Sequence, residues 1–329
     1  MPGPVDELFA APIPEEVWHY TTLAGLEGIL SSNKIWATDA AFTTDSSEFV
    51  HARDVAASFL NSLSPSDEHV AFAKQAVLDM VTKTFDDGVL SRKHTEVFVA
   101  SFSAAADLKS QWIEYADGGR GVSIAFDLRA VRPPADLKLG VTLAPCVYAQ
   151  RDKERLVEAA LSRFVEAAAK HHRLSKDGRY LSGQMRTFAI IERMDGRPLD
   201  KDRLMANLTG KVYAEIRHAA VLTAFDLLRL ASHCKDNSFR QEEEWRLALP
   251  RSTDRPLVHV KIEFRGPRDN IPYLAFDLFQ QNGHLPITKV MTGPLCKDRT
   301  KVDGILTSSG YDVPVVESGI PLRDPNAIA

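Results

Sequence analysis

Hydrophobic and polar residues alternate most regularly in the segment from Glu242 to Leu249. The two-residue period of a β-strand sends half of these side chains to a mainly apolar face, formed by Glu243, Trp245, Leu247 and Leu249. It sends the other half to a polar face, formed by Glu242, Glu244, Arg246 and Ala248. Two carboxylates are therefore expected beside an arginine, on a face that either lines a cleft or belongs to a solvated edge strand.

Strand-like and helix-like patterns alternate between residues 16 and 127. Strands are predicted at 17–20, 34–38, 97–103 and 122–127. Helices are predicted at 47–63, 65–85 and 111–116, together with a short helix that Thr21 or Thr22 caps and that carries Leu23, Leu26, Ile29 and Leu30 on one side. Short elements of both kinds in alternation indicate a domain that mixes helices and strands.

The middle of the chain has a helical period instead. Apolar residues recur at helical spacing from 151 to 217 and again from 203 to 232. Residues 151–217 contain fifteen Lys or Arg and ten Asp or Glu, a net charge of +5, whereas the whole chain carries −4. Two interpretations remain open: solvated helix faces that happen to be basic, or a surface that binds a polyanion such as nucleic acid.

Strand patterns return after residue 242, at 258–264, 287–292 and 315–316. Pro314 has no N–H group to donate, so the last strand is expected to start there or to lie at a sheet edge. The chain is thus expected to form a single α+β domain, 1–329, with a mainly helical, basic insertion at about 150–235.

Composition narrows the class of protein further. The 329 residues are 44% hydrophobic and 26% charged, as in an ordinary globular protein. Cys146, Cys234 and Cys296 form no CxxC pair, so neither a disulfide scaffold nor a zinc ribbon is indicated, and a reducing cytoplasm is expected. The first residues lack the pattern of a signal peptide, and no run of about 18 apolar residues predicts a membrane span.

Two further strands carry polar side chains opposite apolar ones. On the strand that ends at Ser103, Ser101 and Ser103 share a face, and phenylalanines occupy the other. On the first strand, His19 projects away from Trp18 and Tyr20, so it is expected in a cleft if those aromatics lie in the core. A structural histidine is the alternative. The chain has no P-loop, GxGxxG, GxSxG or HExxH motif, and no metal site is predicted.

A series of short motifs spans residues 18 to 323: His19-Tyr20-Thr21-Thr22, Lys34-Ile35-Trp36-Ala37-Thr38, Asp45-Ser46-Ser47-Glu48-Phe49, Ser101-Phe102-Ser103, Gln111-Trp112, Gly121-Val122-Ser123, Glu244-Trp245-Arg246, Gly293-Pro294 and Ser318-Gly319-Ile320-Pro321. In this order the motifs resemble a bacterial family known as domain of unknown function 2971. That family name carries no activity.

The order of the motifs is similar, more loosely, to that of ADP-ribosyltransferases, in which a split, mixed β-sheet holds NAD without a Rossmann glycine motif. The resemblance implies that Glu244 is the catalytic glutamate, that Glu242 orients the acceptor, and that Ser101 occupies the second motif. The residues expected to bind NAD are His19, Tyr20, Thr21, Ser103, Trp112, Tyr115 and Arg246. Among them, Tyr20, Trp112 or Tyr115 is expected to supply a face on which the nicotinamide ring stacks, and ordinary core packing is the alternative for Trp112 and Tyr115. His19, Ser101 and Glu244 are expected to converge on one pocket. Histidine replaces the usual arginine of the arginine-specific enzymes, so the acceptor stays open.

The chemistry of this reaction suits a carboxylate. Cleavage of the nicotinamide–ribose bond builds positive charge on the ribose, and a carboxylate close to it stabilises the transition state more than the ground state. The expected activity is NAD-dependent transfer of ADP-ribose to an unknown macromolecule, as in a toxin or antiphage effector, with nucleic acid bound through 151–217 as one candidate acceptor. NAD glycohydrolase activity and a catalytically silent ligand-sensing or interaction module of the same fold are the alternatives. A nuclease would need a metal-binding carboxylate cluster, and none is evident.

Overall fold

The computed structural model describes residues 3–42, 54–58, 61, 95–129, 141–174, 218–252 except 220, 221, 224, 225 and 228, and then 261–265, 270–276 and 283–323. The helix predicted at 65–85 lies outside the described residues, as does most of the one at 47–63. The strand predicted at 258–264 is described only from Lys261 onward.

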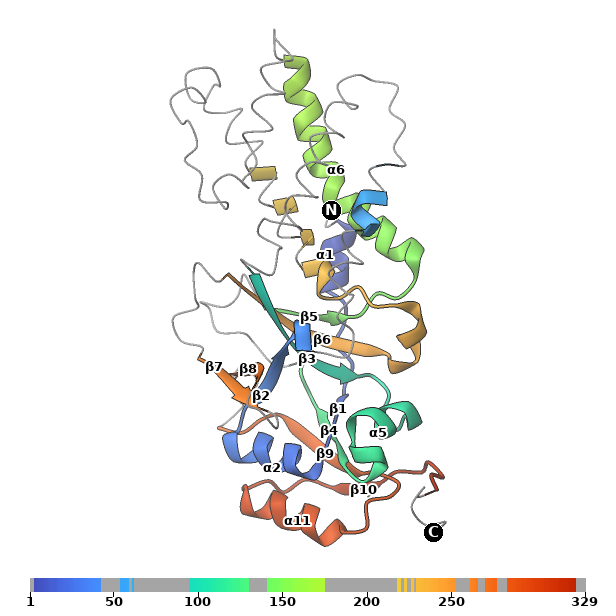
Figure 1. Ribbon diagram of the computed structural model, residues 1–329, viewed down its shortest axis with the longest axis vertical. Coiled ribbons are helices and arrows are strands. Elements are labelled where there is room, and N and C mark those ends of the chain that lie inside the picture. Colours follow the sequence, from blue (N-terminus) through green and yellow to red (C-terminus); the bar gives the residue numbers. More distant parts are fainter. Residues whose placement is uncertain are drawn as a thin grey trace.

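Ten strands form one mixed, mostly antiparallel sheet within these ranges (Figure 1). They are β1 (Val17–Thr21), β2 (Ile35–Asp39), β3 (Thr95–Ser103), β4 (Val122–Phe126), β5 (Thr142–Pro145), β6 (Glu244–Ser252), β7 (Ile262–Arg265), β8 (Ile271–Phe276), β9 (Ile287–Thr292) and β10 (Val315–Glu317). The main path runs β10-β9-β4-β1-β3-β2-β8-β7, while β6 pairs with β3 and carries β5. Of these strand pairs, β9 and β10 run parallel. The predicted α+β class is confirmed.

The described α-helices are α1 (Pro4–Phe9), α2 (Leu23–Ser32), α5 (Lys109–Tyr115), α6 (Gln150–Leu174) and α11 (Arg299–Ser308), with short 3-10 turns η1 (Ala40–Phe42), η2 (Asp117–Gly119) and η3 (Asn237–Glu242). Thr22 caps α2 as one of the two predicted candidates, because its Oγ1 accepts a hydrogen bond from the N–H of Gly25 at 3.0 Å. Figure 1 shows α2 and α11 at one end of the sheet and α6 extending from the opposite end.

Strand β3 divides the sheet. One of its edges pairs with β6 over all nine residues from Thr95 to Ser103. The other edge pairs with β2 at Phe98 and Val99, and with β1 only at Ser103. Because β1 and β2 share this edge but meet it at different points, they diverge between Val99 and Ser103, and the sheet is split there.

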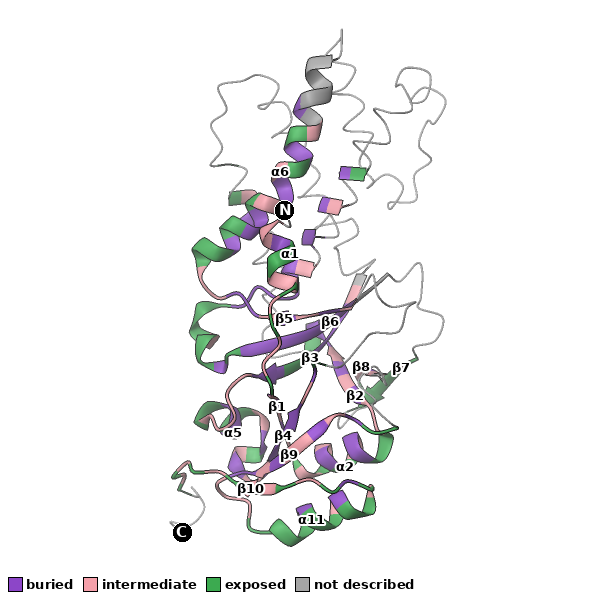
Figure 2. Cartoon of the chain, turned by 180° about the vertical axis from the view of Figure 1, so that it is seen from behind, coloured by how far each residue is buried: buried purple, intermediate pink, exposed green. Residues whose placement is uncertain are grey.

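The two faces of the sheet carry separate cores. Residues opposite each other in an antiparallel ladder point to the same face, so the register assigns each side chain to one of them. The larger core lies on the face of Phe98, Phe102, Trp245, Leu247 and Leu249, under α2 and α11. A smaller cluster on the other face lies next to α5 and contains Trp18, Tyr20, Trp112, Ala116 and Ala125. In Figure 2, β4 and β6 are largely buried, whereas α11 is mostly exposed.

Two glycines allow the backbone to approach closely beside β4. A Cβ atom at Gly121 would lie 2.2 Å from the carbonyl oxygen of Thr21, and one at Gly293 would lie 2.4 Å from that of Gly119. The N–H of Gly293 donates to the carbonyl of Gly121 at 2.9 Å. No other residue type fits at these two points without a shift of backbone, which explains the choice of glycine.

The predicted helical insertion is described in α6 and in parts of 218–235. In α6 the buried residues Leu156, Ala160 and Phe164 follow the predicted helical period. Not all of the basic side chains face solvent, because Lys153 is only 2% exposed. Arg163 is exposed and forms an ion pair of 3.3 Å with Asp226. No helix within the described ranges is long and apolar enough to cross a membrane.

Candidate functional site

The polar residues at the start of β6 form an ionic cluster with Lys235. The ammonium group of Lys235 donates to Oε2 of Glu242 at 2.5 Å and to Oε2 of Glu244 at 2.6 Å. The guanidinium group of Arg246 donates to both carboxylate oxygens of Glu244, at 2.7 and 3.1 Å. All four side chains are buried, with exposed fractions between 4% and 6%. We call Lys235, Glu242, Glu244 and Arg246 the ionic cluster.

The ionic cluster balances two negative charges with two positive ones, which makes its burial tolerable. The backbone fixes the position of Lys235, because its N–H donates to the carbonyl of Val147 at 3.1 Å. A further N–H of Arg246 donates to the carbonyl of Ser232 at 3.1 Å. Removal of one member would leave an unpaired buried charge, which costs about 3–5 kcal/mol.

The two carboxylates of the ionic cluster have pKa values shifted in opposite directions. Burial alone would raise the pKa of Glu244, but Arg246 and Lys235 outweigh burial and lower that pKa to about 2. Burial also raises the pKa of Glu242, and the opposing effect of Lys235 does not cancel the increase. Glu244 is therefore a permanent anion at neutral pH, whereas Glu242 takes up a proton more readily than an ordinary glutamate.

The start of β6 differs from the prediction. Strand β6 begins at Glu244, whereas Glu242 ends η3 and Glu243 has a left-handed backbone with φ 44° and an exposed side chain. The prediction that these two glutamates belong to the strand was wrong. The alternative of a solvated edge strand is wrong as well, because β6 lies between β3 and β5. The predicted apolar face is confirmed for Trp245 and the leucines after it.

The strands that carry the three predicted motifs are neighbours in the sheet, in the order β1-β3-β6. The hydroxyl of Ser103 donates to the carbonyl of Glu242 at 2.7 Å and accepts from the N–H of Ala105 at 3.0 Å. Ser101 is exposed, and its carbonyl oxygen lies 2.9 Å from Nδ1 of His19. The motifs are thus linked by two bonds from side chains to backbone.

His19 does not share a face with Ser101 and Glu244. The register places Trp18 opposite Ser103, so His19, one position further, points to the other side of the sheet. Its ring lies 5.8 Å, centroid to centroid, from that of Phe102 in the larger core. Burial lowers the pKa of His19, so it is neutral at pH 7. The expected convergence of these side chains on one pocket was wrong for His19, because strand alternation separates them.

The residues expected to hold the nicotinamide ring and the rest of NAD mostly pack inside the protein. Tyr20 and Trp112 form an edge-to-face pair with ring centroids 4.9 Å apart, and both polar tips are hydrogen-bonded to the protein. Their exposed fractions are 6% and 0%, so neither offers an open stacking face. Tyr115 is half-buried. Thr21 packs on α2, because a Cβ at Gly25 would lie 2.0 Å from its Oγ1.

Three residues in or next to the ionic cluster were not predicted from the sequence as site residues. Lys235 lies in a polar segment without periodicity, and only the fold brings it to the carboxylates. Tyr148 accepts a hydrogen bond from the N–H of Glu244 at 2.8 Å. His233 is fully buried, with Nδ1 2.9 Å from the carbonyl of Arg229, and burial lowers its pKa to about 4. No three metal-ligating side chains cluster within the described ranges.

The fold and the site define a mixed α+β protein with a split sheet and a buried cluster of two carboxylates and two cations. Residues 111–247 match the model of a family described as a protein of unknown function (DUF2971), which supports the resemblance of the motifs over this part of the chain. The matched region includes Trp112 and the ionic cluster, and it begins after Ser103. No curated protein and no solved structure matches the chain.

Proposed function

We propose that the protein is an ADP-ribosyltransferase-like enzyme that cleaves the nicotinamide–ribose bond of NAD and transfers ADP-ribose to a macromolecule. One observation carries the proposal: the strands with the three motifs are adjacent and are linked at the end of β3. His19 Nδ1 contacts the carbonyl of Ser101, and Ser103 bonds to the carbonyl of Glu242. The split of the sheet at this point adds support, because a split sheet belongs to the fold that the motifs resemble.

The reaction needs one carboxylate that stays charged and one that accepts a proton, and the environments of Glu244 and Glu242 suit these two roles. Glu244, whose pKa is about 2, stays charged and would stabilise the cationic ribose of the transition state. Glu242, whose pKa is raised by burial, is suited to accept a proton from the acceptor. Opposite environments for two neighbouring carboxylates are typical of acid–base pairs in active sites.

Catalysis requires Lys235 to leave the carboxylates. Its ammonium group contacts Oε2 of both Glu242 and Glu244, which is where a cationic ribose would have to lie. The charge balance of the cluster survives such an exchange, because one cation replaces another.

His19 has a different role from the one expected for it. Its side chain lies on the face opposite Glu244, so we assign it to holding the backbone of Ser101 at the split of the sheet. In this proposal His19 is a positioning residue. Arg246 has a separate role, because it orients Glu244 through two hydrogen bonds.

A catalytically silent module of the same fold is the second candidate. The observation in its favour is that both oxygens of Glu244 are already paired and that the side chain is only 4% exposed. In this case the ionic cluster is a structural element that joins β6 to the loop of Lys235. The two candidates differ in whether loss of the Glu244 charge removes a reaction.

Substitution of Glu244 separates the candidates. We expect Glu244→Gln to lower the rate of nicotinamide release from NAD by about a hundredfold or more, since one preorganised electrostatic group is lost. Glu243→Gln is the matched control, because Glu243 is an adjacent, exposed glutamate, and it should leave the rate unchanged. Circular dichroism and thermal melting identify the folded fraction of each variant. Equal rates for folded Glu244→Gln and wild type would assign the carboxylate to structure.

Substitution of Glu242 distinguishes transfer from hydrolysis within the same assay. If Glu242 accepts the proton of the acceptor, Glu242→Gln should release nicotinamide at nearly the wild-type rate while the transfer of ADP-ribose to lysate components falls. Equal loss of nicotinamide release and of ADP-ribose transfer would place Glu242 in cleavage of the nicotinamide–ribose bond. If the wild-type protein releases nicotinamide but labels no acceptor, its activity is that of an NAD glycohydrolase.

A further inference from the structure

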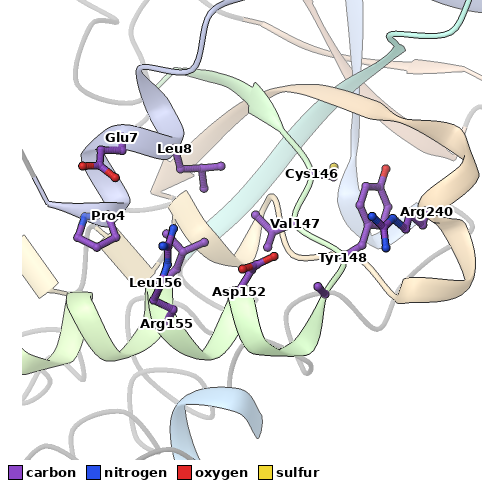
Figure 3. A pocket seen from close by; sticks show the side chains of 11 residues that line it. Pro4, Glu7, Leu8, Cys146, Val147, Tyr148, Asp152, Arg155, Leu156 and Arg240 are labelled. Carbon is purple, nitrogen blue, oxygen red and sulfur yellow. The ribbon is translucent and has the colours of Figure 1, made fainter.

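A pocket lies beside the ionic cluster, between α1, the start of α6 and η3. Its volume is about 440 Å³, within the range of roughly 300–1,000 Å³ that is usual for sites of small molecules. Segments far apart in the sequence meet around it, from Pro4 in α1 to Arg240 in η3 (Figure 3). None of the residues predicted from the sequence as site residues lines it.

The charged side chains of the pocket are balanced but not paired with one another. Arg155 and Arg240 contribute two positive charges, and Glu7 and Asp152 contribute two negative ones. No ion pair joins any of these four to another residue in the part of the chain that the structure describes. Their charges are thus available to a ligand that carries both signs.

The charges are spread along the pocket. Figure 3 shows Arg240 and Tyr148 at one end and Glu7 at the other, with Asp152 between them and Arg155 on the side of Glu7. The hydroxyl oxygen of Tyr148 already accepts from the N–H of Glu244, so its own O–H group can donate to an anion. An arginine and a hydroxyl donor suit a carboxylate. Away from Arg240, the two acidic side chains outnumber Arg155, so this side of the pocket has a net negative charge and suits an ammonium group.

Apolar side chains line the pocket between its charged ends. They come from α1, the loop after β5, and α6: Leu8, Val147 and Leu156. A pocket with a cationic end, a net acidic side and an aliphatic wall matches a ligand with a carboxylate at one end, an ammonium group at the other and an apolar body.

We propose that this pocket binds a short zwitterionic ligand of the peptide class, with its carboxylate at Arg240 and Tyr148 and its ammonium group towards Asp152 and Glu7. The proposal does not depend on cleavage of NAD. Tyr148 lines the pocket and accepts the hydrogen bond from the N–H of Glu244. The ligand would therefore lie next to the first residue of β6, which belongs to the ionic cluster.

Three related probes test the proposal on the full chain. Leu-Leu is zwitterionic, N-acetyl-Leu-Leu lacks the ammonium group, and Leu-Leu amide lacks the carboxylate. Binding to the native state raises the melting temperature by mass action. At millimolar concentration we expect Leu-Leu to raise the melting temperature and to bind about tenfold or more tightly than either blocked form, since each loses one charged hydrogen-bond partner.

Two variants assign the binding to the pocket. Arg240→Gln should weaken Leu-Leu about tenfold but leave Leu-Leu amide unchanged, because the amide has no carboxylate for the arginine to bind. Arg151→Gln is the matched control, since Arg151 is exposed on α6 and does not line the pocket, and it should bind Leu-Leu as wild type does. Melting curves without probe verify that both variants fold. Equal binding of all three probes, no binding of Leu-Leu, or wild-type binding by Arg240→Gln would each overturn the proposal.

Discussion

Lys235 organises the chemistry of the site at the scale of single residues. One ammonium group contacts two carboxylates, and Arg246 completes the pairing of Glu244. Glu244 consequently keeps its charge at any physiological pH. An enzyme that uses this charge has to exchange Lys235 for the cationic substrate, whereas a silent module keeps Lys235 in place.

His233 makes the stability of this region depend on pH. Burial lowers its pKa from 6.5 to about 4, so the unfolded chain binds the proton more readily than the folded one. The contribution of His233 is fully present above pH 6.5 and is lost as the pH falls towards 4. A shift of this size corresponds to about 3 kcal/mol.

His233→Asn removes this titration and keeps a donor near the carbonyl of Arg229. We expect its free energy of unfolding, measured in urea, to fall less between pH 6.5 and pH 4 than that of wild type. His284→Asn is the control, because His284 is exposed, and it should retain the wild-type slope. Glu244 is present in wild type and in both variants, so its contribution to the slope near pH 4 cancels in the comparison. Identical slopes for wild type and His233→Asn would contradict the assignment.

At the scale of elements, strand β3 determines how the strands that carry the motifs are arranged. Its two edges pair with three strands, and the divergence of β1 from β2 opens the sheet next to Ser101. Any function that uses the motifs of β1, β3 and β6 depends on this arrangement, because the contacts of His19 and Ser103 both reach across it.

The period of the side chains predicted β1, β2, β3, β4, β9 and β10, because each alternates or is continuously apolar. It missed β5 and β8, which contain Pro145 and Pro272, residues that usually argue against a strand. Alternation also gave the shared face of Glu244 and Arg246. It could not give their burial, since Lys235 reaches them only through tertiary folding.

The close approach of Gly121 to the carbonyl oxygen of Thr21, beside β4, can be tested by substitution. Gly121→Ala would force a Cβ against the carbonyl of Thr21 and should lower the free energy of unfolding by about 1–3 kcal/mol. Gly304→Ala is the control, because Gly304 lies in α11 with open space around its Cβ position, and it should raise stability by roughly 0.5–1 kcal/mol. Urea denaturation measures both. A neutral Gly121→Ala would show that the strand ends can separate.

The whole molecule combines a split sheet with a helical part that extends away from it (Figure 1). Residues 151–217 carry a net positive charge, and binding of the acceptor to them stays a prediction. In α6 the buried Lys153 does not contribute to a basic surface, whereas Arg163 is exposed and pairs with Asp226. Nucleic acid is one candidate acceptor, and its binding would weaken steeply with salt if phosphate contacts carried it.

Incubation of the purified chain with NAD tests the central claim most directly. NAD labelled in the nicotinamide ring and, separately, in the adenine ring is supplied with and without cell lysate. We predict release of labelled nicotinamide, together with adenine label on a macromolecule when lysate is present. Intact NAD in every condition, from protein whose melting curve is that of the folded state, would contradict the claim and leave the ionic cluster as a structural element.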